Sequence, residues 1–332
     1  SDLLKQGSTF GNFIVGPKIG QGSFGEIYAV RDNSNNAIYA LKIEPNTTKR
    51  KILEFEISIL KYLPSHPCFP FYYASGKSES LTWLAMELLG PSLSSVVKRL
   101  NRRLSFSTGI RVLIFLLDAI RKMHDAGVIH RDIKPSNVLL RRSNESPIAL
   151  IDFGLSRFYV DKNTWQHLPQ RQHPGFRGTA VYASPNAHIH QDLSRRDDLI
   201  SWYYMALDLM VGPLPWRRIE NRAEILHMKR KLSIGAMGGE IAKQFETIWG
   251  LISSLKYEER PNYERIMELL IEAKDEKGVS DTDNWDWHPQ ILFMGKSDDN
   301  LFLEQKQMAR SSSSSELIFP DEIEAQRRYP NT

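Results

Sequence analysis

The chain has 332 residues, of which 41% are hydrophobic and 25% are charged, and these are the proportions of a globular protein. Its length allows one large bilobed unit or two ordinary domains. The net charge of +4 gives no argument for nucleic acid, and the longest aliphatic run, Val112 to Leu117, is far too short to span a bilayer. The single cysteine, Cys68, excludes an internal disulfide and favours a reducing compartment, and no charged-then-apolar leader opens the sequence, so we expect a cytoplasmic protein, with the nucleus as a further location.

The first predicted elements are two strands, Phe13 to Ile19 and Glu26 to Val30, joined by a glycine-rich turn with the sequence GQGSFG. Glycines in such a turn let backbone N–H groups approach phosphate oxygens without a side chain in the way. The same glycine spacing opens dinucleotide-binding folds, but there a helix follows at once. Strand-forming residues follow here, so we prefer the hairpin. The candidate phosphate-binding residues are Gly20, Gly22, Ser23 and Gly25.

The next predicted strand, Ala37 to Ile43, contains one charged residue, Lys42, which either snorkels at a strand edge or binds phosphate. Helical spacing over residues 51 to 63 places Glu56 in the middle of an apolar arc and Glu54 on the opposite side. Because an unpaired buried carboxylate is costly, Glu56 needs a partner, and Lys42 is the natural candidate. The alternative is that Glu56 lies at the helix edge and faces water.

Two more strands are predicted over Phe69 to Ser75 and Leu81 to Met86. Residues 87 to 91 break this pattern, which is where a linker between two lobes should fall. Beyond the linker, apolar residues at helical spacing predict a long buried helix over Ser107 to His124.

That helix leads to residues 128 to 137, with the sequence VIHRDIKPSN, in which Pro135 excludes helix interior and indicates a loop. An Asp such as Asp132 can accept a proton from an attacking hydroxyl, and a Lys such as Lys134 can neutralise a transferring phosphate. An Asn such as Asn137 supplies a neutral oxygen ligand for Mg²⁺. The alternative is a surface loop that carries these charges by chance.

Short strands are predicted over residues 138 to 140 and 149 to 151, and the second ends at Asp152, followed by Phe153 and Gly154. An Asp at a strand end before a flexible glycine is placed to bind Mg²⁺ that bridges the phosphates of ATP. The sequence therefore predicts that two loops converge on one metal ion, with Asn137 and Asp152 as its ligands.

These features occur in the order in which protein kinases have them, and Lys134, two residues after Asp132, is typical of the serine/threonine branch. Residues 86–93, 178–186 and 194–199 resemble the casein kinase one superfamily. Residues 176–179, 186–188, 214–217 and 285–287 look most like its tau-tubulin kinase branch. The resemblance covers about residues 12 to 290 and includes all of the candidate residues above.

The resemblance implies an α+β, bilobal protein-kinase fold. It predicts a small, mostly antiparallel β N-lobe with one main helix at residues 10–90, a larger α-helical C-lobe at 91–290, and a serine-rich extension at 291–332. It also implies that the chain transfers the γ-phosphate of ATP, with Mg²⁺, to Ser and Thr hydroxyls of protein substrates. The rival hypothesis is a pseudokinase or scaffold that uses the same fold to bind partners.

The resemblance also implies residue roles. Lys42 holds the α- and β-phosphates, Glu56 keeps Lys42 in line, and Asp198 braces the catalytic loop. Thr179, next to the substrate, is expected to bond Asp132 and Lys134 rather than to carry phosphate. The remaining nucleotide-binding candidates are Ile27, Ala40, Met86, Glu87, Leu89 and Leu139.

Two departures from the superfamily affect substrate choice and stability. Casein kinase one enzymes have Arg at the position of Val181, where it helps to bind an anion or a primed substrate. Arg177 and the trio at residues 229 to 231 offer an alternative attraction for acidic substrates, although the plainer interpretation of the trio is a solvated helix face. The second departure, Ser-Pro-Asn at residues 184 to 186, leaves Arg260 without the glutamate that pairs with its counterpart.

No Ser, Thr or Tyr lies between Trp165 and Gly178, so we expect activity without activation-loop phosphorylation. We expect a monomer whose partners are protein substrates, acidic or cytoskeleton-associated, and neither nucleic acid nor membrane. The run from Ser311 to Ser315 is low in complexity and is interpreted as a solvated linker, with autophosphorylation at Ser315 as a further hypothesis.

Overall fold

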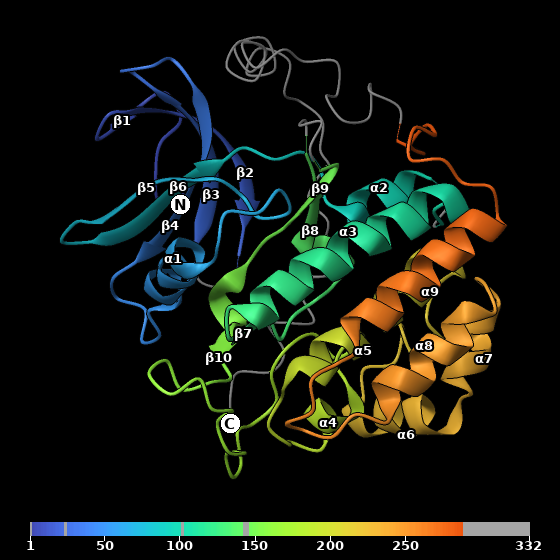
Figure 1. The fold of residues 1–332 in the computed structure, drawn as a ribbon. Coiled ribbons are helices and arrows are strands. Elements are labelled where there is room, and N and C mark those ends of the chain that lie inside the picture. The colour runs from blue at the N-terminus through green and yellow to red at the C-terminus, as the bar shows by residue number, and fades with distance from the viewer. Residues whose placement is uncertain (1, 23–24, 101–102, 142–145, 288–332) are drawn as a thin grey trace. The chain divides into compact units, whose positions relative to one another are not determined.

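The computed structural model in Figure 1 describes residues 2–22, 25–100, 103–141 and 146–287. By their contacts, the described residues form two compact units, one of residues 2–58 and 71–88 and the other of residues 59–70 and 89–287. The predicted extension at 291–332, including Ser311–Ser315, lies outside the described residues, and so does Ser23.

Within the described residues, the first unit is built on a six-stranded antiparallel sheet with the strand order β1-β2-β3-β4-β6-β5 (Figure 1). The strands are β1 (Thr9–Phe10), β2 (Phe13–Gln21), β3 (Glu26–Asp32), β4 (Ile38–Pro45), β5 (Tyr72–Lys77) and β6 (Leu81–Glu87). Helix α1 (Ile52–Tyr62) begins in this unit. The β2–β3 pairing shifts in register between Val15 and Lys18, on either side of Pro17, which has no N–H to donate.

The sheet separates two sets of side chains because successive residues of a strand point to opposite faces. One face carries a buried core that includes Val15, Tyr28, Val30, Leu41 and Ile43. Its neighbours in sequence, Lys42 among them, therefore point to the other face. Register places Ile27, Ala40 and Met86 on this second face with Lys42.

The predicted strand over Phe69 to Ser75 is wrong at its start, since β5 begins at Tyr72. Pro70 cannot donate a ladder hydrogen bond, and Phe69 belongs to the second unit, where its ring packs edge-on against Phe153 at 5.9 Å between centroids. The neighbouring Cys68 is buried as expected, and burial raises the pKa of its thiol to about 11.

The second unit is mainly helical. Its helices are α2 (Leu93–Arg99), α3 (Phe106–Asp125), α4 (Pro185–His188), α5 (Arg195–Met210), α6 (Arg222–Lys231), α7 (Ile234–Gly239), α8 (Gln244–Ser253) and α9 (Tyr263–Glu276). Its strands are β7 (Val128–Ile129), β8 (Val138–Leu140), β9 (Ile148–Leu150) and β10 (Arg157–Phe158), in the pairs β7–β10 and β8–β9. Helix α3 packs against α5 and α9 (Figure 1).

Helix α5 is buried along most of its length, including Trp202, Tyr203 and Tyr204, so it forms the centre of this unit. Helix α3 begins where Ser105 caps it, with the Ser105 Oγ accepting a hydrogen bond from the Thr108 N–H. The predicted α+β class, a small antiparallel sheet unit and a larger helical unit, is confirmed. Among the described residues, no helix combines the length and the apolar character needed to cross a membrane.

Candidate active site

The first unit contains a buried ion pair on its sheet. Lys42 lies on β4, opposite Ile27 of β3 and Leu84 of β6. Its Nζ donates a hydrogen bond to Glu56 Oε2 on α1 at 2.6 Å, and Glu56 is only 2% exposed. Glu54, on the opposite side of α1, is partly exposed and pairs with Lys77. The predicted pairing of Lys42 with Glu56 is therefore confirmed, and the helix-edge alternative is wrong.

Strand register places further candidates on the same face as Lys42. Ile27 pairs directly with Lys42, and Met86 pairs with Ala40, two residues before Lys42. This face of the sheet therefore combines apolar side chains with one ammonium group, which suits an aromatic ring attached to phosphates.

The glycine turn that precedes β3 is closed by a hydrogen bond from the Gly22 N–H to the Gly25 carbonyl oxygen at 2.8 Å. A Cβ added at Gly25 would lie 1.9 Å from the Ile43 carbonyl oxygen, so only glycine fits there. Gly20 pairs with Ile27 across the β2–β3 ladder. The predicted strand, turn and strand are therefore present.

The remaining nucleotide-binding candidates are divided between the two units. Glu87 ends β6 in the first unit, where its N–H donates to the Phe71 carbonyl oxygen. Leu139 lies on β8 in the second unit and is partly buried, opposite Ala149 of β9. Leu89, also partly buried, begins the second unit.

In the second unit, the predicted catalytic loop follows β7 and holds the carboxylate of Asp132 between two neighbours. Thr179 Oγ1 donates to Asp132 Oδ1 at 2.8 Å, and Lys134 Nζ donates to Thr179 Oγ1 at 2.9 Å. Lys134 Nζ also lies 3.0 Å from Asp132 Oδ2. The predicted contacts of Thr179 with Asp132 and Lys134 are confirmed, and they fix a carboxylate and an ammonium group side by side.

The same loop offers oxygen ligands for a divalent cation. Asn137 is buried, and its Nδ2 donates to the Asp132 carbonyl oxygen at 2.9 Å, which leaves the amide oxygen to act as a ligand. The Asn137 carbonyl oxygen accepts from the Ile151 N–H at 2.9 Å, so the residue before Asp152 is tied to the catalytic loop. An amide oxygen and a carboxylate are the hard oxygen donors that Mg²⁺ prefers, so Asn137 and Asp152 fit such an ion.

The buried carboxylate of Asp198 on α5 supports the backbone of the catalytic loop. Asp198 accepts hydrogen bonds from the backbone N–H groups of His130 at 2.7 Å and Arg131 at 2.8 Å, and its Oδ2 lies 2.9 Å from His124 Nε2. Burial alone would raise the pKa of Asp198, but its bonds with His124 and the His130 backbone hold that pKa below its ordinary value. The predicted bracing of the loop by Asp198 is confirmed.

The activation segment, which comprises residues 152–186, approaches this loop closely at Gly178. Its φ of +93° is a left-handed conformation, and a Cβ there would lie 2.6 Å from the Arg131 carbonyl oxygen. Arg131 itself has a φ of +71°, which is strained for a residue with a side chain and is held by the bond to Asp198. Glycine at 178 therefore allows the next residue, Thr179, to reach Asp132.

The interpretation of residues 229 to 231 as a solvated or substrate-binding trio is wrong for Lys229, which is 3% exposed. Its Nζ donates to the carbonyl oxygens of Ala180 at 2.7 Å and Ala183 at 2.6 Å, and lies over the rings of Tyr204 and Trp216. Burial lowers the pKa of Lys229. This lysine supports the segment after Thr179 from inside the fold, whereas its two neighbours in the trio are exposed.

His188 lies against Lys229 and is also buried. Burial, together with the charge of Lys229, lowers the pKa of His188 to about 3. At pH values between about 3 and 6.5, His188 binds a proton in the unfolded chain but not in the folded chain. The free energy of unfolding therefore falls as the pH falls through this window, by up to about 1.4 kcal/mol per pH unit from this group.

Urea unfolding at a series of pH values from 7 to 5 measures this effect in the wild type and in His188→Gln. We expect the substitution to remove this share of the pH dependence. The neighbouring His190, which is exposed, provides the control His190→Gln, in which we expect the wild-type slope to remain. An unchanged slope in His188→Gln would contradict the assignment.

The departure at residues 184 to 186 has a structural counterpart. The Ser184 hydroxyl and the Asn186 amide both donate to the buried Asp197. Arg260, which precedes α9, pairs instead with Glu264 in the first turn of that helix, with Nη–Oε distances of 3.0 and 3.1 Å. As the sequence predicts, position 186 offers Arg260 no glutamate, and Glu264 pairs with Arg260 instead.

The other departure, Val181, contributes its backbone to the fold, because its carbonyl oxygen accepts a hydrogen bond from Trp216 Nε1.

Comparison with known proteins agrees with this geometry. Residues 13–274 match the family described as "Protein kinase domain". The chain is 36% identical over 283 residues to a probable serine/threonine-protein kinase of Dictyostelium discoideum, and the matched region covers 84% of this chain and 57% of that protein. It is 33% identical over 285 residues to casein kinase I homolog RAG8 of Kluyveromyces lactis, and the matched region covers 83% of this chain and 53% of that protein.

A third relative, serine/threonine-protein kinase spe-6 of Caenorhabditis elegans, is 32% identical over 276 residues, which is 80% of this chain and 73% of that protein. The chain thus spans little more than half the length of the first two relatives. It belongs to the protein kinase domain family, and the relatives named here are serine/threonine kinases and casein kinase I homologues.

Proposed function

We propose that this chain is an active serine/threonine kinase that transfers the γ-phosphate of ATP to hydroxyl groups of protein substrates. The observation that carries the proposal is the set of contacts among Asp132, Lys134 and Thr179. Asp132 orients the substrate hydroxyl and takes its proton, and Lys134 neutralises the charge of the phosphoryl group in transfer. Thr179 holds both side chains in place.

Protein kinases use ATP with Mg²⁺, which supplies charge neutralisation at the phosphates. Asn137 and Asp152 would hold the metal ion. Lys42, oriented by Glu56, would hold the α- and β-phosphates, and the sheet face with Ile27 would contact the adenine. The other nucleotide-binding candidates are Gly20, Gly22, Ser23, Gly25, Ala40, Met86 and Glu87 in the first unit and Leu89 and Leu139 in the second.

The rival proposal is a pseudokinase or scaffold, and it is disfavoured because each catalytic part has its residue. Incubation of the purified chain with labelled ATP and casein separates the two. An active kinase labels casein in the presence of Mg²⁺, and the Asp132→Asn variant does not. Equal labelling by both proteins would favour the scaffold.

We place the chain in the casein kinase one superfamily, in a position like that of the tau-tubulin kinases. Casein kinase I homologues among the relatives support the superfamily, and the stretches at 176–179, 186–188, 214–217 and 285–287 support the branch. With Lys229 buried, Arg177 and the exposed residues Arg230 and Lys231 are left to attract acidic or cytoskeleton-associated substrates. A peptide-library screen tests this preference, and a requirement for primed peptides would contradict it.

We further propose that the kinase needs no activation-loop phosphate, and that it acts as a monomer in the cytoplasm, with the nucleus as a further location. Two hydroxyl groups at the start of the activation segment are inaccessible, because Ser156 is buried and the Tyr159 hydroxyl donates to the His124 carbonyl oxygen. Thr164 is exposed in a turn capped by Asp161. Mass spectrometry that finds an obligatory phosphate at Ser156, Tyr159 or Thr164 would refute this.

The buried ion pair in the first unit gives a matched test of nucleotide binding. Glu56→Gln removes the charge that orients Lys42 and should lower kcat/KM for ATP by about 10- to 100-fold, since a hydrogen bond to a charged group contributes about 1.5–3 kcal/mol. Glu54→Gln on the same helix removes only a partly exposed pair with Lys77, so kcat/KM should stay within about twofold. Equal effects of the two substitutions would argue against a role for the Lys42–Glu56 pair.

A further inference from the structure

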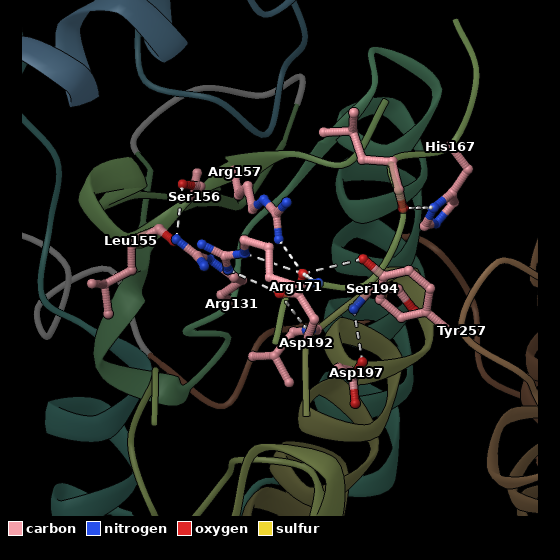
Figure 2. Close-up of polar contacts among 12 residues, drawn as sticks. Arg131, Leu155, Ser156, Arg157, His167, Arg171, Asp192, Ser194, Asp197 and Tyr257 are labelled. Atoms are coloured by element: carbon pink, nitrogen blue, oxygen red, sulfur yellow. Dashed lines mark hydrogen bonds and ion pairs between the residues drawn. The ribbon is translucent and has the colours of Figure 1, made fainter. Parts of the chain in front are cut away.

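Arginine side chains gather around one buried carboxylate in the second unit (Figure 2). Asp192 is 1% exposed, and the guanidinium groups of Arg157 and Arg171 both point toward it. Arg157 Nη1 donates to Asp192 Oδ2 at 2.5 Å. Arg171 donates from Nε at 3.1 Å and from Nη2 at 2.8 Å, and its backbone N–H adds a third bond at 3.0 Å. Such a forked pair is among the strongest polar contacts in proteins.

The residues in this cluster come from separate parts of the chain. Arg157 lies on β10, at the start of the activation segment, and Arg171 lies in the middle of that segment. Asp192 lies in the loop between α4 and α5. The Asp192 carboxylate therefore holds both Arg157 and Arg171, two residues of the activation segment that are 14 positions apart in the sequence.

The cluster is also connected to the catalytic loop. Arg157 pairs with Ile129 across the β7–β10 ladder, directly before that loop. Arg131, next to Asp132, donates from Nε to the Leu155 carbonyl oxygen and from Nη2 to that of Ser156. A displacement of the activation segment would therefore be transmitted to the residue beside the catalytic carboxylate.

The arginines would repel one another without this carboxylate. Desolvation and the nearby charges of Arg171, Arg177 and Arg157 lower the pKa of Arg131 to about 10. Burial would raise the pKa of Asp192, but hydrogen bonds from Arg171 and Arg157 override it and hold that pKa far below its ordinary value. Asp192 thus carries a permanent negative charge at the centre of a positively charged cluster.

We propose that Asp192 is a positioning residue whose fixed carboxylate holds the activation segment in its active arrangement, a task that a phosphate group on the segment performs in kinases activated by phosphorylation. The inference rests on the proposed kinase function and names how its activity is maintained. The negative charge is part of the chain, so no second enzyme has to add it.

The test compares three variants of the whole chain. Asp192→Asn keeps the shape and removes the charge, Asp192→Glu keeps the charge, and Tyr257→Phe removes only the hydroxyl that lies 3.4 Å from Asp192 Oδ2. We expect Asp192→Asn to lower kcat by about 10- to 100-fold, because a misplacement of about 1 Å can cost about 10²-fold. KM for ATP should change little, Asp192→Glu should recover most of kcat, and Tyr257→Phe should match the wild type.

Limited digestion with trypsin adds a readout that is independent of activity, since Arg171 and Arg177 are cleavage sites inside the segment. Asp192→Asn should be cut there faster than the wild type at a temperature at which both remain folded by circular dichroism. A folded Asp192→Asn variant with wild-type kcat and wild-type cleavage would overturn the inference. If the wild type labels no substrate, the proposed function fails, while the cleavage comparison still decides whether Asp192 holds the segment.

Discussion

Replacement of Asp132 by Asn should lower the rate of phosphate transfer by about 10²- to 10⁴-fold while the chain stays folded, which is the contribution expected from a general base. Asn has the same shape and can still accept the hydrogen bond from Thr179 Oγ1, which is 2.8 Å from Asp132 Oδ1 in the wild type. It cannot take a proton from a substrate hydroxyl. Lys134, 3.0 Å from Asp132 Oδ2, also loses its anionic partner.

Single-turnover measurements with casein and thermal unfolding of the same samples check this result. KM for ATP should change only a few-fold, because Lys42 and its partner Glu56 are untouched. Asp161→Asn is the control, since this carboxylate lies in the same unit but only caps a turn at Asn163 and Thr164. A rate above about one tenth of wild type in Asp132→Asn would mean that another group takes the proton.

The second large effect concerns Asp198. Asp198→Ala should lower the free energy of unfolding by about 3–5 kcal/mol, the cost of removing one partner of a buried charged network. The substitution leaves the N–H groups of His130 and Arg131 and the ring of His124 without their acceptor in the interior. Activity should fall as well, since the Arg131 N–H loses the acceptor that helps to hold its left-handed backbone in the catalytic loop.

Urea unfolding of Asp198→Ala and of a surface control, Asp275→Ala on α9, measures this cost. Asp275 is exposed, so its replacement should change the free energy of unfolding by no more than about 0.5 kcal/mol. If Asp198→Ala costs no more than the control, the carboxylate does not hold the loop. A variant that is destabilised yet fully active would show that the bracing serves stability alone.

Local patterns were sufficient to predict several of the site residues. Helical spacing alone distinguished Glu56, which is buried, from Glu54, which is partly exposed, because the face of a helix is set by residues within a few turns. The offsets among Asp132, Lys134 and Asn137 lie within one loop, so their closeness did not depend on distant packing. These predictions used only short-range geometry.

Other features depend on packing between distant segments and could not be predicted in the same way. Lys229 is in a basic stretch that indicates a solvated helix face, and only the rings of Tyr204 and Trp216 and two carbonyl groups 46 and 49 residues away make its burial favourable. Asp192 has no motif around it, and its role follows from arginines that precede it by 21 and 35 residues. A buried charge with distant partners leaves little trace in the local sequence.

The most direct test of the account is the transfer of labelled γ-phosphate from ATP to casein by the whole chain after treatment with a phosphatase that is then removed. We predict Mg²⁺-dependent labelling that begins at once, without a lag in which the chain phosphorylates itself, and that is absent in Asp132→Asn. No labelling by the treated wild type, or equal labelling by Asp132→Asn, would contradict the account.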